Sequence, residues 1–429
     1  MRRRSRLPRR GIVHGMLALL LALALAAIGS AQEITHYTYA GHSDSWYQHL
    51  KNMAERFQAE TGIQVNVIQS TGNYQEQVLT MIAGGAPPDV TDFHPQLGPT
   101  LIEQGLFTDL RPYVERSGLD LTQIPPIAVE GVTAPDGTLW SLPVSVFPVV
   151  TYFNADMFAV AGLPNPIELG EDWTWESFRE SARRLTVDRN GDGQPDQYGI
   201  EGRITARWEQ QVHQAGGQWF DRLVFPTQSR FNTPEVLEAV RFITGLMHED
   251  GVVAPTSGFS IWPSVGNVAM TVVDGPGVIA SYWQDATFAW DITVQPKGPA
   301  SRAARVNPDG FQILRDSPNK DAAWRWIHYL VGSVDNQLEF AATTGRLPSL
   351  RDAMLRYDEQ LDIQLPPNWM AFFETAFDPN GYAAYVIPAN VQSTINTTIA
   401  QVWNGTLSPE DGLQRIHDVT TALLAEQNR

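Results

Sequence analysis

"ITHYTYAGHSDSWYQHLKNMAERFQAETGIQVNVIQ", residues 34–69, joins two strand patterns through one helix pattern. Residues 34–40 are rich in β-branched and aromatic side chains, and residues 63–69 place apolar side chains at alternate positions. Between them, apolar residues recur at helical spacing, and Gly62 is placed to end the helix. A strand, a helix and a second strand in this order predict the beginning of an α/β fold.

The same alternation continues along the chain. A helix is expected from about Tyr74 to Ile82, ending in the breaker "AGGAPP", and "DVTDF" at 89–93 has the composition of a short strand. The next segment, "LGPTLIEQG", predicts another helix. The βαβαβ unit so formed predicts a parallel sheet with helices on its faces.

Two extended segments punctuated by proline and glycine interrupt this alternation. The first is "GTLWSLPVSVFPVVTYFN" at 137–154, and the second is "DITVQPKGPA" at 291–300. Each is interpreted as a passage from one lobe to another, because a second α/β region lies between them. Lobes joined more than once form a hinge, and ligands bind in the crevice between such lobes.

The N-terminus has the pattern of an export signal. A basic head with six arginines precedes the apolar run "MLALLLALALAAI", and small residues at 29–31 predict cleavage near Ala31. An uncleaved anchor helix is the alternative interpretation. The chain has no cysteine, so it uses no disulfide, and a soluble monomer in the periplasm is expected. Removing residues 1–31 takes away six arginines and no acids, so the formal net charge moves from −17 to −23, which argues against nucleic acid as a partner.

Six stretches resemble, in the same order, motifs of one known family. They are "YQEQVLTMIAGGAPPDV", "TLWSLPVSVFPVVTYFNADMFAVAGL", "DWTWESFRESARRL", "VGNVAMTVVDGPG", "SPNKDAAWRWIHYLV" and "TTGRLPS". The family is that of the extracellular solute-binding proteins of ABC importers, in the group that includes the maltose-binding protein. The resemblance runs from about residue 33 to the C-terminus.

The resemblance implies a two-lobed α/β periplasmic-binding-protein fold of type II, with three crossover segments forming a hinge. It implies closure on a small ligand, delivery to the permease subunits of an ABC importer, and no chemistry on the ligand. With the crossings above, it predicts a first lobe of residues 32–145 and 294–345 and a second lobe of residues 146–293 and 346–429. One departure concerns Gly277, which stands where the best-known sugar binder of the family has a tryptophan; the nearest aromatic residues are Tyr282 and Trp283.

Sugars are recognised by aromatic rings against their C–H faces and by planar polar groups at their hydroxyls. The chain has 13 tryptophans. The carboxyl ends of parallel strands face the crevice, so polar residues that follow the predicted strands are candidate ligand contacts. In the first lobe these candidates are His42, Asp44, Asn73, Tyr74, Asp92 and His94. Helix capping is the alternative role for Asp44 and Asp92.

Candidates in the second part of the chain have several grounds; they are Trp208, Asp274, Trp283, Arg346 and Tyr382. The resembled family places cleft residues near Trp208 and Trp283. Arg346 lies in an expected hinge turn, and Tyr382 precedes a helix pattern and is expected to close the far side of the cleft. A structural salt bridge is the alternative role for Arg346. Trp173, Trp175, Trp324 and Trp326 lie at or in helical patterns and are expected to pack structurally. The ligand is expected to be a mono- or oligosaccharide.

Two other functions are weighed against sugar binding. A glycerophosphodiester or a phosphorylated sugar would need arginines in the cleft, for which Arg203, Arg207 and Arg346 are candidates. A secreted carbohydrate-active enzyme would need paired carboxylates. The sequence contains no HExxH and no G-x-S-x-G motif, and the resembled family offers no catalytic group. We therefore expect a binding protein and not an enzyme.

"TVDRNGDGQPDQYG" at 186–199 resembles most of a calcium loop. Its candidate ligands are Asp188, Asn190, Asp192, the carbonyl of Gln194, and Asp196. Such loops normally end with a bidentate acid at the twelfth position, and here that position is Gly199. The alternative is an Asx-rich turn that leads into a strand at "YGI". No cofactor is required by the predicted function, and calcium would be structural.

Overall fold

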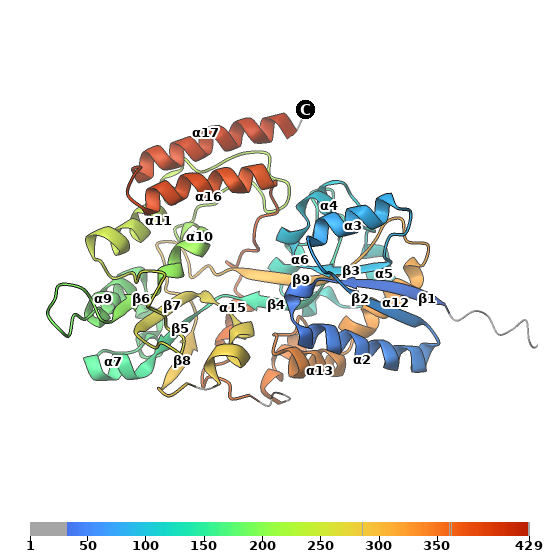
Figure 1. The fold of residues 1–429 in the computed structure, drawn as a ribbon, viewed down its shortest axis with the longest axis horizontal. Coiled ribbons are helices and arrows are strands. Elements are labelled where there is room, and N and C mark those ends of the chain that lie inside the picture. The colour runs from blue at the N-terminus through green and yellow to red at the C-terminus, as the bar shows by residue number, and fades with distance from the viewer. Residues whose placement is uncertain (1–31, 285, 360, 362, 428–429) are drawn as a thin grey trace, which may run out of the picture.

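The computed structural model describes residues 32–427 except residues 285, 360 and 362. The predicted export signal, residues 1–31, lies outside the described residues. Two mixed sheets, each covered by helices, form two lobes that lie side by side (Figure 1). The two-lobed α/β fold expected from the sequence is confirmed.

The first sheet has the strand order β2-β1-β3-β9-β4. Its strands are β1 (Glu33–Thr38), β2 (Gln64–Gln69), β3 (Val90–Phe93), β9 (Val306–Ile313) and β4 (Leu142–Pro148). β1 pairs in parallel with both β2 and β3, as the βαβαβ pattern predicts. β9 is antiparallel to β3 and β4, and it inserts between them. A segment from late in the chain therefore completes the sheet that the N-terminus begins.

Helices cover this sheet because their apolar faces match its buried side chains. α2 (Asp44–Thr61) packs on β2 and ends at Gly62, which adopts the left-handed conformation that the predicted stop requires. α3 (Tyr74–Ala83) and α4 (Pro99–Glu103) lie on the opposite face from α2, where Figure 1 shows them above the strands. α12 (Lys320–Val331) and α13 (Val334–Thr344) pack against α2. Trp324 and Trp326 are buried in α12, which confirms their expected packing role.

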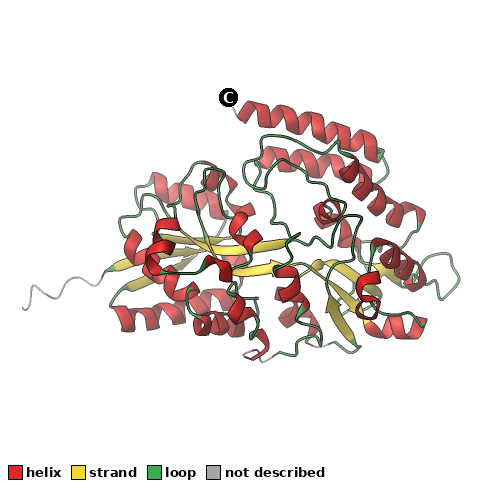
Figure 2. Ribbon diagram, turned by 180° about the vertical axis from the view of Figure 1, so that it is seen from behind, coloured by secondary structure: helices red, strands yellow, loops and turns green. Residues whose placement is uncertain are grey.

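The second sheet has the strand order β6-β7-β5-β8. Its strands are β6 (Tyr198–Ile200), β7 (Val268–Asp274), β5 (Val150–Asn154) and β8 (Trp290–Thr293). The strand expected at "YGI" is therefore present. α9 (Trp175–Leu185) packs on β6 and β7 with Trp173 and Trp175 buried at its start, as expected. Figure 2 shows the two sheets end to end, with helices along both faces of the molecule.

The other helices of the described chain complete the two lobes. They are α5 (Arg111–Ser117), α6 (Pro126–Glu130), α7 (Ala155–Ala161), α8 (Pro166–Leu169), α10 (Glu209–Gln214), α11 (Pro234–Thr244), α14 (Arg351–Met354), α15 (Ala371–Ala376), α16 (Ala389–Trp403) and α17 (Pro409–Gln427). α16 and α17 form an antiparallel pair that packs on α11, outside the second sheet (Figure 1).

Three connections join the lobes. β4 passes into β5 through Val149 alone, and β8 returns to β9 through residues 294–305. A third segment runs from α15 to α16 and bridges the lobes' backbones, with Tyr382 paired to Arg305 and Val386 paired to Val224. α14 packs on α13, and α15 contacts both β4 and β5. The exact lobe boundaries predicted above stay a prediction.

Candidate functional site

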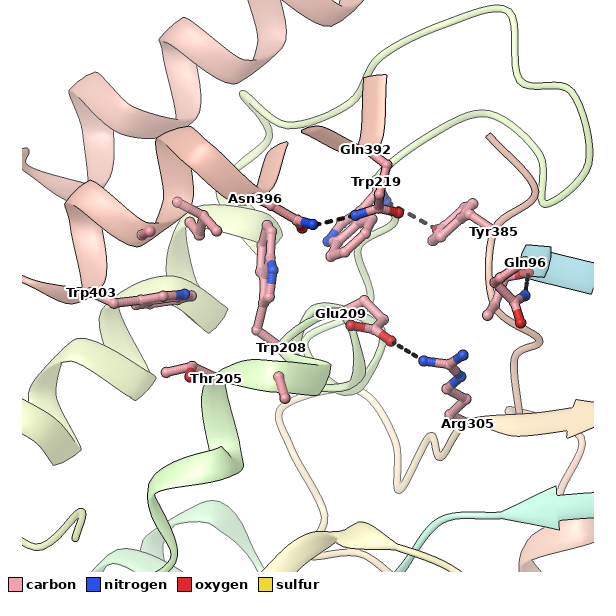
Figure 3. Close-up of a pocket in the computed structure, with 14 residues that line it drawn as sticks. Gln96, Thr205, Trp208, Glu209, Trp219, Arg305, Tyr385, Gln392, Asn396 and Trp403 are labelled. Atoms are coloured by element: carbon pink, nitrogen blue, oxygen red, sulfur yellow. Dashed lines mark hydrogen bonds and ion pairs between the residues drawn. The ribbon is translucent and has the colours of Figure 1, made fainter. Parts of the chain in front are cut away.

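A cavity of about 390 Å³ lies where two of the three connections meet the second lobe (Figure 3). One wall comes from the first lobe through Gln96, which follows β3 in the short helix η2 (Pro95–Leu97). The other walls come from η5 (Gly202–Arg207), α10, α16 and the two connections near residues 305 and 385. The lining residues are Gln96, Thr205, Ala206, Trp208, Glu209, Trp219, Arg305, Ala384, Tyr385, Gln392, Asn396, Ile399, Ala400 and Trp403.

Aromatic rings form most of one side of the cavity. The ring centroids of Trp208 and Trp219 are 4.6 Å apart, and Trp403 meets Trp208 edge to face at 6.0 Å. Tyr385 stacks on Trp219 with an interplanar angle of 9°. Trp208 and Trp219 are buried, so their positions are fixed by packing, while Trp403 is only half-buried. This cluster offers rigid apolar faces to a ligand.

Polar side chains face the aromatic cluster from the other walls (Figure 3). Glu209 and Arg305 form an ion pair of 3.2 Å that ties α10 to the second connection. Gln96 accepts a hydrogen bond from the Asn307 amide at 3.0 Å, which ties η2 to β9 within the first lobe. On α16, Gln392 donates to Asn396 at 2.9 Å. Carboxylate, amide and guanidinium groups beside aromatic faces can bind hydroxyl-rich ligands.

Several polar atoms at this junction have no partner in the described protein. They are Trp219 Nε1, Arg305 Nε, Asn307 Oδ1 and Tyr382 Oη. Buried donors and acceptors are nearly always hydrogen-bonded, so unpartnered ones call for an explanation. Their location next to the cavity marks this junction as a place where a ligand can supply partners.

Two further arginine clusters lie at the facing ends of the sheets. Arg203 binds Asp274 at 2.5 Å and Glu201 at 2.6 Å at the carboxyl ends of β7 and β6. Burial alone would lower the pKa of Arg203, but the hydrogen bonds and charges of these two acids outweigh it and raise the pKa. Across the junction, Arg346 binds Asp309 at 2.6 Å and donates to the His42 carbonyl at 2.8 Å.

Residues 40–337 match the model of the family described as bacterial extracellular solute-binding protein. The chain belongs to this family. The match covers every strand of the two sheets except β1, and it ends within α13.

Relatives of this solute-binding protein cover nearly its whole length. A Brucella abortus (strain 2308) protein named only as a binding protein is 24% identical over 389 residues, which are 87% of this chain and 88% of the relative. The ABC substrate-binding protein of Listeria monocytogenes in complex with cycloalternan has a TM-score of 0.74 at 24% identity, covering 92% of this chain and all of that one. The sugar-binding protein MalE of Xanthomonas citri has a TM-score of 0.76 at 20% identity, covering 92% and 98%. These likenesses establish a shared fold.

Of the predicted ligand residues, Trp208 lines the cavity and Tyr382 lies beside it. The Tyr382 ring stacks on His213 at 4.1 Å, and its hydroxyl has no protein partner. Burial lowers the pKa of His213 to about 4, so this imidazole is neutral at neutral pH. The site roles of these residues stay predictions.

The predicted residues of the first lobe lie together, but most are held by internal partners. Asp92 accepts hydrogen bonds from the side chains of His36, Thr38 and Trp46 and from the backbone of Tyr39. His42 stacks on Trp46 at 4.1 Å, and burial lowers its pKa to about 4. Burial also lowers the pKa of His94, whose Nδ1 lies 3.2 Å from Gln96 Oε1.

Three other predicted residues stand apart from the cavity walls. Asn73 caps α3 by accepting from Glu76 N, and Tyr74 is buried with its hydroxyl on the Tyr37 carbonyl. Asp44 is exposed in the first turn of α2, whose cap is Ser43, so the capping role considered for Asp44 is wrong. The capping role considered for Asp92 is also wrong, because its side-chain partners belong to β1 and α2 and it accepts no hydrogen bond from the first backbone N–H groups of any described α-helix.

Trp283 is a predicted ligand contact, but the structure buries it in the core of the second lobe. It is buried against Tyr152 and Trp290, with centroids 5.4 and 4.4 Å away. Its neighbour Tyr282 is the exposed ring and stacks on Trp262 at 4.0 Å. Asp274, another predicted ligand contact, forms an ion pair with Arg203, so its carboxylate already has a partner within the protein.

Most of the cavity lining was not selected from the sequence. Gln392, Asn396, Ile399, Ala400 and Trp403 recur at the spacing of one helical face. That spacing is the one local signal that could have found part of the site. Gln96, Glu209, Trp219 and Arg305 carry no comparable pattern, since each is brought to the cavity by a different segment.

The Asp-rich loop uses its oxygens on its own backbone. Asp188 accepts from Gly191 N and Gly193 N, and Asp196 accepts from Arg189 N and Asn190 N. Asp192 likewise accepts from Gln194 N. In the part of the chain that the structure describes, no group of three or more His, Asp or Glu side chains is placed to hold a metal ion. Calcium binding stays a prediction, and a melting temperature that responds to calcium and to chelator is its test.

None of the helices in the described ranges combines the length and the apolar character needed to cross a membrane.

Proposed function

We propose that this chain is the substrate-binding component of an ABC importer and captures a mono- or oligosaccharide in the cavity between its lobes. The observation that carries the proposal is the cavity itself, where Trp208, Trp219 and Trp403 face amide and charged side chains from the other walls. Aromatic faces and planar polar groups together match the two surfaces of a sugar ring.

Relatives support a carbohydrate ligand. Solved structures that share the fold hold cycloalternan, α-D-tagatose, maltotriose and ribitol. The tryptophan-lined cavity of this chain has the chemistry that such polyhydroxylated ligands require.

The proposed mechanism is closure of one lobe on the other. The cavity is lined by Gln96 from the first lobe, by Trp208 from the second and by Arg305 from a connection between them. A ligand that contacts all three stabilises the closed arrangement relative to any open one, and so shifts the population toward it. The closed form is then recognised by the permease subunits.

The proposal includes location, assembly and the absence of catalysis. The chain is exported to the periplasm by residues 1–31, acts as a monomer, and releases its ligand unchanged. Light scattering of the purified protein tests the monomer, and N-terminal sequencing of the exported protein tests cleavage near Ala31. Incubation with a panel of glycosides tests for hydrolysis, and turnover of any of them would overturn the binding-only role.

The decisive experiment identifies the bound molecule. Protein purified under native conditions is analysed by native mass spectrometry for a co-purified ligand, and candidate sugars are then titrated by calorimetry. We expect one-to-one binding of a sugar to the native protein and a clearly weaker interaction with Trp403→Ala. No binding across neutral and charged mono- and disaccharides would overturn the proposal.

A further inference from the structure

The three arginines that the sequence offers for an anionic ligand differ in their partners. Arg203 is bound by two carboxylates, and Arg346 is bound by Asp309 and the His42 carbonyl. Arg207 forms no ion pair and no hydrogen bond with any described residue; its contact is the ring of Phe147, 5.3 Å from the guanidinium carbon. Of these three arginines, Arg207 alone therefore keeps its guanidinium donors free for a ligand.

Arg207 is adjacent in the chain to residues of the cavity wall. It is the last residue of η5, between Ala206 and Trp208, which both line the cavity wall. Burial, followed by the positive charge of Arg305, lowers the pKa of Arg207 to about 10. Glu209 and Asp274 act in the opposite direction without compensating these effects. The protein thus holds a partly buried cation near a second one, which an anion would stabilise.

The neighbours of Arg207 add further unpartnered donors. Arg305 pairs with Glu209 through Nη1, while its Nε has no partner in the described chain. Tyr382 is buried, and its hydroxyl has none either. Its position is fixed because its backbone donates to Ala304 O at 3.1 Å and accepts from Val306 N at 2.8 Å, and its ring rests on His213.

We infer that Arg207, Arg305 Nε and the Tyr382 hydroxyl form an oxyanion subsite, so that the captured sugar carries a carboxylate or a phosphate. This inference rests on the proposed function and names the class of sugar. A guanidinium presents donors in a planar fork that matches the oxygens of either group, and charge-assisted hydrogen bonds of this kind are strong. The aromatic cluster receives the ring of the sugar, and the oxyanion subsite receives its charged substituent.

The test compares sugars in matched pairs that differ by one anionic group. The pairs are galactose and galacturonate, glucose and glucose 6-phosphate, and trehalose and trehalose 6-phosphate, titrated by calorimetry at pH 7.5. We expect at least one anionic member to bind tenfold to a hundredfold more tightly than its neutral partner. The carboxylate and phosphate pairs identify which oxyanion is preferred.

Variants separate the subsite from general effects. Arg207→Gln should remove the preference within the pair, Arg207→Lys should retain part of it, and Tyr382→Phe should reduce it. Arg415→Gln makes the same chemical change at an exposed position of α17 and should leave the preference unchanged. Melting temperatures of all variants show that each is folded.

The outcomes distinguish the inference from the proposed function. Equal affinity for both members of every pair, or a preference untouched by Arg207→Gln, overturns the inference while sugar capture stands. Binding of inorganic phosphate or glycerol 3-phosphate with no binding of any sugar overturns sugar capture while the oxyanion subsite stands.

Discussion

Replacing Asp92 with asparagine tests whether this residue holds the first lobe together or contacts the ligand. The sequence makes Asp92 a ligand candidate, but its fully buried carboxylate accepts four hydrogen bonds from within the protein. Trp326 donates to Nδ1 of His36 at 3.0 Å, so a neutral His36 carries its proton on Nε2 and donates it to Asp92. Asp92 therefore joins β1, α2 and, through His36, α12.

The magnitude follows from counting acceptors. Each carboxylate oxygen of Asp92 accepts two hydrogen bonds, and an asparagine replaces one oxygen by an amide group that can only donate. Two charge-assisted hydrogen bonds are lost, and at least one buried donor is left unpaired. At about 1.5–3 kcal/mol for each bond, we expect Asp92→Asn to lower the free energy of unfolding by about 4 kcal/mol.

The assay is equilibrium unfolding in urea, followed by tryptophan fluorescence and far-UV circular dichroism. Asp44→Asn is the matched control, because Asp44 is an exposed candidate of the same type without an internal partner, and a change within about 0.5 kcal/mol is expected. An Asp92→Asn protein with an unchanged midpoint and abolished sugar binding would refute the structural role.

The effect of Asp92 also has a defined pH dependence. Burial would raise the pKa of its carboxyl, but the hydrogen bond from His36 and the charges of His42 and His36 outweigh burial, so the pKa lies below the ordinary 3.8. The contribution to stability is therefore complete above about pH 4 and lost as pH falls through the folded-state value. The difference in stability between the native protein and Asp92→Asn should shrink below pH 4, and a constant difference would contradict this.

Three further predictions use other parts of the site. Asp309→Asn leaves the Arg346 guanidinium without its carboxylate, so urea unfolding should show a loss of about 3 kcal/mol, and an unchanged midpoint would contradict it. Trp403→Ala should weaken sugar binding about tenfold in calorimetry with a small change in melting temperature, because the ring is only half-buried; unchanged affinity would exclude Trp403 from the site. Burial lowers the pKa of both His42 and His49 from 6.5 to about 4, so as the pH falls the two histidines become protonated in the unfolded state before they do in the folded state. The free energy of unfolding, measured in urea, should therefore fall between pH 6.5 and pH 4 by about 3 kcal/mol for each histidine. A free energy of unfolding that stays constant over this range would contradict the prediction.

The sequence predicts the first three strands and their helices because the signals are local. Apolar spacing, Gly62 and the "AGGAPP" breaker each act within one turn or strand. β9 lacks such a signal, since "VNPDGFQI" contains both proline and glycine. Close packing explains why position 310 is a glycine. A Cβ atom there would lie 2.4 Å from Ser141 Oγ and 2.7 Å from the Leu142 carbonyl oxygen, so no larger residue fits. That constraint comes from β4, which is far away in sequence.

The candidate site is predicted less well, because partners decide which side chains remain available. The rule that polar residues after parallel strands face the crevice places Asp92 at the right edge of the sheet. It gives no information on the four donors that surround the carboxylate. Gln96, four residues later, reaches the cavity. Arg203 and Arg207 each have a glutamate two residues away in sequence, and the tertiary contact of Arg203 with Asp274 distinguishes them.

The unpartnered polar atoms connect the site to the hinge. Arg305 ends the second connection and Asn307 follows it in β9, Tyr382 belongs to the third connection, and Trp219 belongs to the second lobe. A buried polar group without a partner costs about 1–3 kcal/mol, so a ligand that satisfies these atoms gains affinity at the segments on which lobe movement depends. A sugar held only by the tryptophans would interact with the second lobe alone. A ligand that also bonds to Arg305 and Tyr382 is coupled to the connections, and such coupling is what hinge closure on a ligand requires.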